Sequence, residues 1–323
     1  MPHDVTVRTY RTTDLDAILT IVAAASLADG ERANFGPADL QTWLADPRWT
    51  PAQDLLVAEI AGHGVVGLGE GRLRGEAGHQ MYRSECHVHP AFRRRGVGRA
   101  LLEAQWQRVQ AISQAAGDTP VVLGARVAAH QADARALFES FGMRRVRYFF
   151  DMVRDLVQPI PPVVVPDGLK LTTWAARRDD RAVWAGFNEA FEDHWGHLPE
   201  DFASFSYRID AGWMNLDCSY VAWDGDEVAG ASLNDMGPAA VRHYGRNQGW
   251  IGILYVRRPW RQRGLARALL AQSLLQARAL GHDLAGLRVD AENLTGAVQL
   301  YETVGFTVEK TVAAYHRVYP AEA

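Results

Sequence analysis

A short basic motif with small residues at fixed spacing occurs twice in this sequence of 323 residues. The first copy comprises Arg93, Arg94, Arg95, Gly96, Val97 and Gly98, and the second comprises Arg261, Gln262, Arg263, Gly264, Leu265 and Ala266. Arginines are charge-assisted donors for phosphate oxygens, and glycine or alanine lets the backbone approach a bulky pyrophosphate closely. Each motif is therefore predicted to bind the phosphates of a ligand.

Each motif lies between a predicted strand (84–89 and 249–257) and a predicted helix (98–116 and 266–280). The first turn of a helix has unpaired N–H groups at the positive end of the helix dipole, which favours anions. The second helix has an apolar stripe at helical spacing, formed by Leu265, Leu269, Ser273 and Ala277 with Leu270 and Leu274 beside it.

Other phosphate-binding motifs fit less well. No Gly-Lys-Ser/Thr follows either copy, which excludes a nucleoside-triphosphate loop. The dinucleotide fingerprint needs a third small residue where Leu101 or Leu269 stands. A basic surface turn without a ligand is the remaining alternative, and the recurrence of the same strand–turn–helix context argues against it.

The sequence similarity extends beyond the motif. The two motifs are 168 residues apart, and Ala134, Phe138 and Gly142 match Ala297, Tyr301 and Gly305 at an offset of 163. We interpret this as a duplication and predict an N-terminal domain (1–157), a proline-rich extended linker (158–166) and a C-terminal domain (167–323). Each domain is predicted to be an α/β unit on a mixed sheet that ends in a short helix and a closing hairpin.

Both halves resemble the GNAT acyltransferase superfamily, whose signature is the same Arg/Gln-x-x-Gly-x-Gly/Ala motif. The second half adds a segment similar to that family's own, with Asn293, Ala297, Tyr301, Gly305 and Phe306. The tandem arrangement is similar to that of mycothiol synthase-type proteins.

The resemblance implies a sheet splayed between its fourth and fifth strands, with the co-substrate acetyl-CoA in the gap and no metal. Its pyrophosphate would bind the two motifs, and Asn293 would join the cofactor-binding residues. Its pantetheine amides would pair with strand backbone at Leu254 and Val256 in the second copy and at Cys86 and Val88 in the first.

Acetyl transfer to an amine needs a base, because an ammonium group has a pKa of about 10.4, and it is helped by an acid at the leaving sulfur. The resemblance assigns the acid to Tyr301, whereas the first copy has Phe138, so the second domain is predicted to be catalytic. The first is predicted to bind CoA while being catalytically degenerate, although Glu85 could serve it as a base. The fourth strand of the second domain carries no carboxylate, so the candidate bases, acting through water, are His243, Asp235 and His194; the alternative is a reaction without a dedicated base.

An acceptor site is predicted between the first helix and the hairpin of the second domain. Glu192 and Asp193 would attract a cationic amine, Trp195 would form a wall, and His194 would be a hydrogen-bond partner. The alternative is a packed turn with Trp195 and Phe191 in the core. A metal at His194 and His197 lacks a third ligand.

Composition limits the function further. The net charge of -4 argues against a nucleic-acid binder, and no apolar run of about 18 residues or signal-peptide core is present. We expect a cytoplasmic monomer or homodimer in which Cys86 and Cys218 are packed thiols. The predicted activity is N-acetylation of a small-molecule amine; the alternatives are an acyl-CoA sensor without turnover and a protein N-acetyltransferase.

Overall fold

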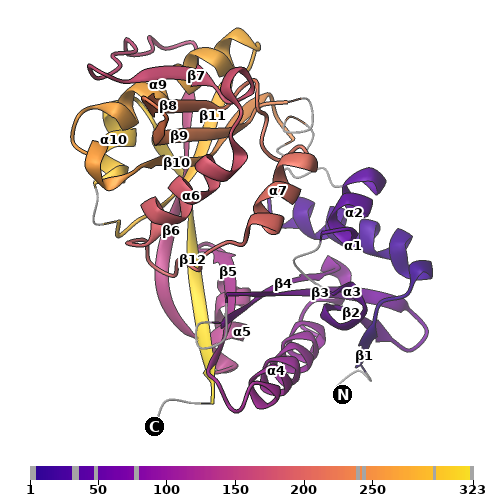
Figure 1. Cartoon of the computed structure of the whole chain (residues 1–323). Helices are drawn as coiled ribbons and strands as arrows, with labels where there is room; N and C mark the ends of the chain where they lie inside the picture. The colour runs from indigo at the N-terminus through magenta and orange to yellow at the C-terminus, as the bar shows by residue number, and fades with distance from the viewer. Residues whose placement is uncertain are drawn as a thin grey trace. The chain divides into compact units, whose positions relative to one another are not determined.

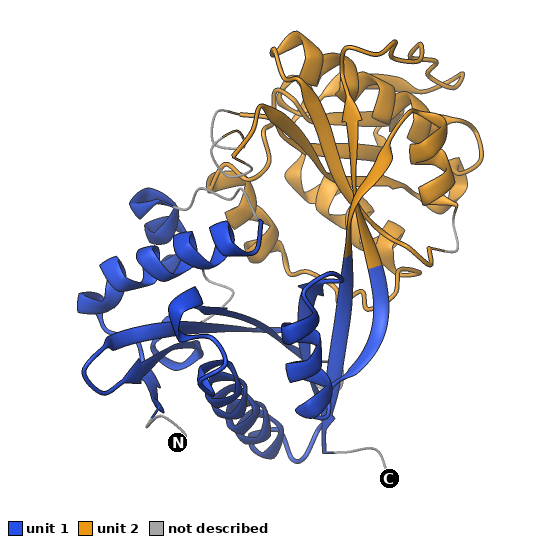
Figure 2. Ribbon diagram, turned by 180° about the vertical axis from the view of Figure 1, so that it is seen from behind, with its two compact units in different colours: residues 1–148, 312–323 blue, residues 149–311 orange. Residues whose placement is uncertain are grey.

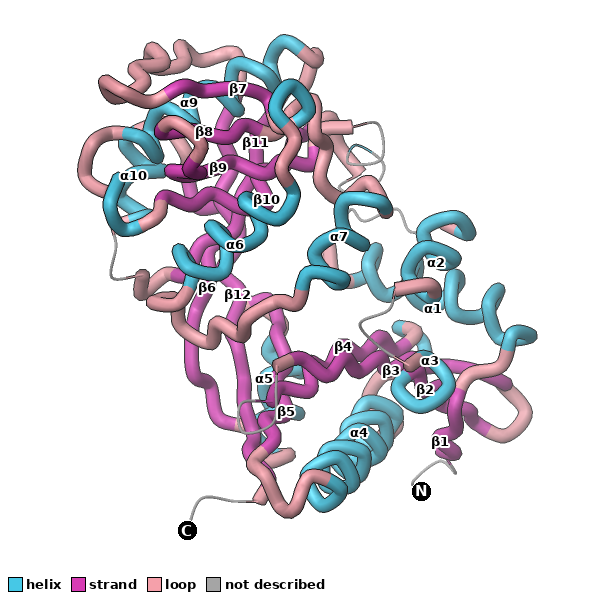
Figure 3. Tube along the Cα trace, in the orientation of Figure 1, coloured by secondary structure: helices cyan, strands magenta, loops and turns pink. Residues whose placement is uncertain are grey.

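The structure is a computed structural model that describes residues 5–30, 36–46, 50–75, 80–237, 241, 245–293 and 296–320. The chain forms two compact units, residues 1–148 with 312–323 (unit 1) and residues 149–311 (unit 2) (Figure 2). Each unit is an α/β structure in which helices flank a mixed sheet, as predicted (Figure 1, Figure 3).

Unit 1 has the strand order β1-β2-β3-β4-β5-β12. Its strands are β1 (Val5–Thr9), β2 (Leu55–Ile60), β3 (Gly64–Arg74), β4 (Gln80–Val88), β5 (Val121–Ala128) and the second part of β12 (Thr307–Tyr319). Its helices are α1 (Leu15–Ala28), α2 (Pro37–Leu44), α3 (Pro51–Asp54), α4 (Val97–Ala115) and α5 (Ala132–Ser140). The strands β4 and β5 are parallel, and the other pairs are antiparallel.

Unit 2 repeats this plan in the order β6-β11-β10-β9-β8-β7. Its strands are the second part of β6 (Arg144–Asp155), β7 (Lys170–Thr173), β8 (Tyr220–Asp224), β9 (Glu227–Asp235), β10 (Gln248–Val256) and β11 (Leu284–Asp290). Its helices are α6 (Asp180–Phe191), α7 (Phe202–Asp210), α9 (Leu265–Ala279) and α10 (Ala297–Thr303). Only β10 and β11 pair in parallel among the described strands of this unit.

The closing strands differ from the prediction. In unit 1, Val312–Tyr319 of β12 pairs with β5, and in unit 2, Phe149–Asp155 of β6 pairs with β11. Each unit is thus completed by a strand from the other half of the sequence, and one long strand stands where each closing hairpin was predicted. The compact units consequently do not coincide with residues 1–157 and 167–323, and residues 158–166 contain no helix or strand.

Helices cover both faces of each sheet. In unit 2 the predicted stripe of α9 is buried against one face, where Leu265, Leu269, Leu270 and Leu274 are at most 1% exposed. On the other face α6 and α7 pack an aromatic cluster around Trp174, Phe187 and Phe205. A buried polar residue also ties each long helix to its sheet. Gln105 of α4 bonds Ser84, and Ser273 of α9 bonds Ser232.

Candidate functional site

The two basic motifs fold into the same turn. In unit 1 it joins a 3-10 helix (Pro90–Phe92) to α4, and in unit 2 it joins a 3-10 helix (Arg258–Trp260) to α9. Arg94 and Gly96 have φ of 63° and 88°, and Gln262 and Gly264 have φ of 61° and 85°. Left-handed non-glycine residues are costly and concentrate at ligand sites, so their recurrence at one spacing marks both turns as candidate sites.

Space is open over both glycines. A Cβ added to Gly96 or Gly264 would meet no atom within 4 Å, so the N-terminal end of each helix is accessible to a bulky anion. Gly98 is small for another reason, because its Cβ would lie 3.0 Å from Leu137 of α5. The geometry therefore fits a pyrophosphate at each turn.

The first arginine of each motif bonds within the protein. Arg93 donates to the carbonyl of Val88 and forms a bidentate ion pair with Asp29, with N–O distances of 2.7 and 2.9 Å. Arg261 likewise donates to the carbonyl of Val256 and pairs with Asp193 at 3.3 Å. Both guanidinium groups thus brace the turn against the strand before it, while 36% of the Arg93 side chain and 30% of the Arg261 side chain stay exposed.

The other arginines lie nearer the surface. Arg94 pairs with the exposed Asp133 at 3.1 Å, Arg95 lies over the ring of Phe92, and Arg263 donates to the carbonyl of Asp167. Neither Arg95 nor Arg263 forms an ion pair within the described ranges. We regard these two side chains as the stronger candidates for phosphate contacts.

Both sheets splay at the strand before the turn. Pairing of β4 with β5 ends at Ser84, although β4 continues to Val88. Pairing of β10 with β11 ends at Ile251, and the register of β10 against β9 shifts between Ile251 and Ile253. The predicted backbone sites lie beyond the point of splaying in both units: Cys86 and Val88 in unit 1, Leu254 and Val256 in unit 2.

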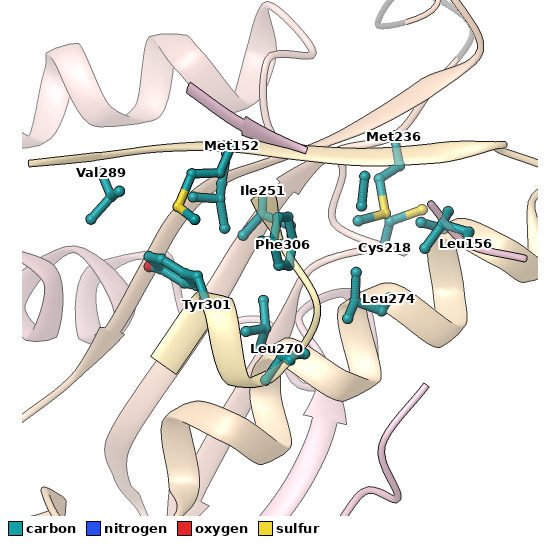
Figure 4. Packing of buried hydrophobic residues seen from close by; sticks show 14 residues of the cluster. Met152, Leu156, Cys218, Met236, Ile251, Leu270, Leu274, Val289, Tyr301 and Phe306 are labelled. Carbon is teal, nitrogen blue, oxygen red and sulfur yellow. The ribbon is translucent and has the colours of Figure 1, made fainter. Parts of the chain in front are cut away.

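Tyr301 of α10 lies at the splay of unit 2. Its ring belongs to one buried cluster with Ile251 of β10 and Val289 of β11, and Leu254 packs against the same cluster. Figure 4 shows the hydroxyl directed away from Phe306 and Leu274. Burial raises the pKa of Tyr301 to about 12, so the hydroxyl keeps its proton at neutral pH.

The equivalent residue of unit 1 is Phe138, which is 9% exposed. Its ring packs against Tyr315 of β12 with a centroid distance of 5.4 Å, and the hydroxyl of Tyr315 donates to Glu139. The hydroxyl of Tyr315 is thus already bonded to a carboxylate, and the side chain of Phe138 has no hydroxyl. Unit 1 has the turn and the splay but no counterpart of the Tyr301 hydroxyl at that position.

Two of the predicted bases of unit 2 lie in described segments. Asp235 stands opposite Trp250, next to the point where β10 leaves β11, and burial raises its pKa to about 6. His194 follows α6 and stacks on Phe191 at 4.2 Å; burial, with a smaller effect of His197, lowers its pKa. His243 lies outside the described residues. Asn293 is described, and its backbone N–H bonds the carbonyl of Asp290.

The predicted acceptor carboxylates are engaged by arginines of the turn. Asp193 pairs with Arg258 at 2.6 Å as well as with Arg261, and Glu192 lies 3.4 Å from Arg258. Both carboxylates are thus paired with arginine, but they remain 45% exposed at Asp193 and 58% exposed at Glu192. Trp195 is 37% exposed and lies beside Phe149 at 6.2 Å, which leaves it available as a wall.

Glu85 in unit 1 has an acidic partner that was not predicted from the sequence. Glu85 of β4 stands directly opposite Glu70 of β3, and Glu85 lies 3.5 Å from His87. Burial, with the neighbouring Glu85 carboxylate, raises the pKa of Glu70, whereas the hydrogen bond with His87 lowers the pKa of Glu85. His87 therefore makes Glu85 less basic than a free carboxylate. Glu70 lies two residues before Arg72 on β3 and therefore on the same face of the strand. This alternation could have indicated Glu70 from the sequence.

The described ranges contain neither a cluster of metal-ligating side chains nor a membrane-spanning helix. No group of three or more His, Cys, Asp or Glu side chains there could hold a metal ion. None of the helices in that part of the chain has the length and apolar character needed to cross a bilayer.

The sequence matches a known family twice. Residues 24–143 and 181–306 each match the family described as acetyltransferase (GNAT) family. A mycothiol acetyltransferase of Geodermatophilus obscurus is 31% identical over 312 residues, covering 93% of each chain. That of Thermobispora bispora is 31% identical over 311 residues, covering 94% of this chain and 96% of the relative.

Solved structures show the same tandem fold. A GCN5-related N-acetyltransferase from Sphaerobacter thermophilus has a TM-score of 0.77 and 25% identity, covering 97% of this chain and 95% of its own. A tandem GNAT protein from the clavulanic acid biosynthesis pathway has a TM-score of 0.70 and 19% identity, covering 99% of this chain and 100% of its own. The second likeness concerns the fold alone.

Proposed function

The chain belongs to the GNAT acetyltransferase family, and from this premise we propose that unit 2 transfers the acetyl group of acetyl-CoA to the primary amine of a small molecule. The observation that carries the proposal is the combination, in one unit, of an open glycine turn, a splayed strand pair and the buried hydroxyl of Tyr301.

Acetyl-CoA supplies the acetyl group as an activated thioester when it is bound. The residues of unit 2 fit it, because a Cβ built on Gly264 at the start of α9 meets no atom within 4 Å, and the edge of β10 beyond Ile251 is unpaired on the β11 side within the described residues. The turn residues 261–266 would hold the pyrophosphate. Backbone at Leu254 and Val256 would hold the pantetheine amides, and an N–H of this edge would donate to the thioester oxygen.

Tyr301 would assist departure of the sulfur. A hydroxyl with a pKa of about 12 is protonated at neutral pH and donates a hydrogen bond to a thiolate, whose conjugate acid has a pKa of about 8.5. Because tyrosine is the weaker acid of the two, the proton stays on the Tyr301 oxygen at that stage and the sulfur leaves as a hydrogen-bonded thiolate. Tyr301 acts as the acid in this sense, as a hydrogen-bond donor that stabilises the charge of the leaving group.

Asp235 is the stronger candidate base. A carboxylate with a pKa of about 6 is ionised at pH 7 yet more basic than an exposed one, so it can accept a proton from the amine, directly or through water. His194 is the second candidate, since its lowered pKa keeps the imidazole neutral and able to accept a proton. The strand β10 itself carries no carboxylate.

The acceptor is proposed from the relatives. The two curated relatives described above are named mycothiol acetyltransferases, so an amine related to mycothiol is the first acceptor to test. For unit 1 we propose that it holds acyl-CoA without turnover, because its turn is intact and Phe138 lacks a hydroxyl.

Release of CoA thiol from acetyl-CoA, with and without added amines, tests the proposal. The panel contains mycothiol-related amines, other small amines and a lysine-containing protein. We expect release only when a small amine is present. Binding of acetyl-CoA without release would support a sensor, and release with the protein alone would support a protein acetyltransferase; either result would contradict the proposal.

A further inference from the structure

The exchanged strands carry equivalent arginines. Arg154 lies on β6 in unit 2 and Arg317 lies on β12 in unit 1. They are 163 residues apart, the same offset that relates Phe138 to Tyr301. Each unit thus receives one arginine from the other half of the sequence.

Arg154 is 2% exposed, and its guanidinium is satisfied by backbone carbonyls. Its Nε donates to the carbonyl of Val304 at 2.6 Å, its Nη2 to that of Pro159 at 2.7 Å and its Nη1 to that of Asp155 at 3.3 Å. Burial lowers its pKa. A buried cation is retained only where such acceptors compensate its lost hydration, so removing it would leave carbonyls unpaired.

The carbonyl of Val304 belongs to the turn that ends the helix of Tyr301. The N–H of Val304 donates to the Tyr301 carbonyl at 3.1 Å, and the N–H of Phe306 donates to the same carbonyl at 3.0 Å. Gly305 has φ of 94°, and a Cβ there would lie 3.2 Å from the Nε of Arg154. Glycine therefore both forms the turn and admits the guanidinium, whose charge also suits the negative end of the helix.

We propose that Arg154 is a positioning residue for Tyr301: it fixes the C-terminal turn of α10 and thereby the direction of the Tyr301 hydroxyl at the splay. This inference rests on the proposed function, in which Tyr301 is the acid. It also gives the exchanged strand β6 a role, because a residue from the N-terminal half of the sequence then sets the geometry of the catalytic unit.

Unit 1 offers a matched control. Arg317 donates to the carbonyl of Phe141 at 2.9 Å, and Gly142 follows with φ of 80°, its Cβ position 3.7 Å from the Arg317 Nε. The same contact therefore ends α5. Since α5 carries Phe138, Arg317 fixes a helix without a hydroxyl to direct.

The experiment compares Arg154→Met with Arg317→Met in the full chain, alone and combined with Tyr301→Phe. Because a displacement of about 1 Å at a reacting group can cost about 10²-fold, we expect Arg154→Met to lower kcat by about 10–10²-fold, with KM for acetyl-CoA little changed. Arg317→Met is expected to keep kcat. In the Tyr301→Phe background, Arg154→Met is expected to lower kcat by less than about 3-fold, because coupled residues are not additive. Arg154→Lys, which keeps the charge and one donor, should recover part of kcat.

The outcomes separate the two proposals. If Arg154→Met lowered kcat by the same factor with and without the Tyr301 hydroxyl, Arg154 would only stabilise the fold. Thermal unfolding of Arg154→Met and Arg317→Met would measure the accompanying loss of stability. Unchanged kcat in Arg154→Met would overturn the inference outright. Unchanged kcat in Tyr301→Phe alone would instead refute the proposed role of Tyr301, and a loss confined to Arg317→Met would move catalysis to unit 1.

Discussion

The sheet faces covered by α1 in unit 1 and by α6 in unit 2 differ at equivalent positions. In unit 1, Glu70 and Glu85 stand opposite each other on neighbouring strands, whereas in unit 2 the same positions hold Leu233 and Ile253. The glycine turns that follow β4 and β10 have nearly identical backbone conformations. The two repeats thus share the backbone conformation of the glycine turn, while the carboxylates on the neighbouring sheet face differ.

This difference between the two units shows that the surroundings of a carboxylate on a strand determine how basic it is. In unit 1 the two glutamates repel each other, and His87 holds Glu85 ionised. In unit 2, Leu233 belongs to the apolar cluster, and Asp235 lies two residues further on the same face. Desolvation there raises the pKa of Asp235 to about 6, so Asp235 is more basic than Glu85, whereas in unit 1 burial raises the pKa of Glu70 instead.

The largest effect is expected for Tyr301→Phe, which converts unit 2 to the residue of unit 1. Loss of a general acid predicts a decrease in kcat of about 10²–10⁴-fold with little change in acetyl-CoA affinity. Steady-state kinetics and calorimetric binding measure the two effects separately. Phe138→Tyr is the reciprocal variant and should not raise activity; a gain there would show that unit 1 can turn over.

The next largest effect is expected for a substitution in the glycine turn of unit 2. Gly264→Glu places a carboxylate near the proposed pyrophosphate, and two like charges about 4 Å apart repel by about 4 kcal/mol near a protein surface, so acetyl-CoA affinity should fall by about 10³-fold. Gly264→Ala is the control for this variant. It introduces the backbone strain that any side chain has at φ of 85°, but it adds no charge.

Gly96→Glu is the matched variant in unit 1. It should remove one of two calorimetric CoA sites and the thermal stabilisation due to that site, while most of kcat remains. If Gly96→Glu abolished turnover and Gly264→Glu did not, catalysis would belong to unit 1.

Local features of the fold could be predicted from the sequence, whereas long-range ones could not. The strand–turn–helix order and the buried stripe of α9 follow from glycine spacing and period 3.6, and α4 spans Val97–Ala115 against a predicted 98–116. The strand exchange was not predictable, because the two halves repeat one pattern and either closing strand satisfies either sheet. The spacing located Arg93 but not its partner Asp29, which is 64 residues away in the sequence.

The smallest of the three effects is expected for Asp235→Asn, which removes the proposed base of unit 2. We expect kcat/KM to fall by about 10²-fold at neutral pH. Since only the carboxylate accepts a proton, wild-type activity should also decline as the pH falls through about 6, and this limb should vanish in the variant. A wild-type limb that persists in Asp235→Asn would favour His194, and His194→Gln would then be expected to remove it.

The folding stability of the protein should respond to Asp235→Asn in the opposite direction to its activity. Burial raises the pKa of Asp235 from 3.8 to about 6, so between these values the folded protein keeps a proton that the unfolded chain has released. This group therefore stabilises the fold most at low pH, and the contribution is lost as the pH rises through about 6. Asp235→Asn should accordingly unfold at a higher temperature than the wild type at pH 8, with the difference shrinking toward pH 4. A variant that is slower yet more stable at pH 8 would show that unit 2 keeps a destabilising carboxylate for its chemistry, as expected of a catalytic base. Equal melting temperatures at both pH values would mean that the carboxylate is hydrated in solution and too weak a base for the proposed role.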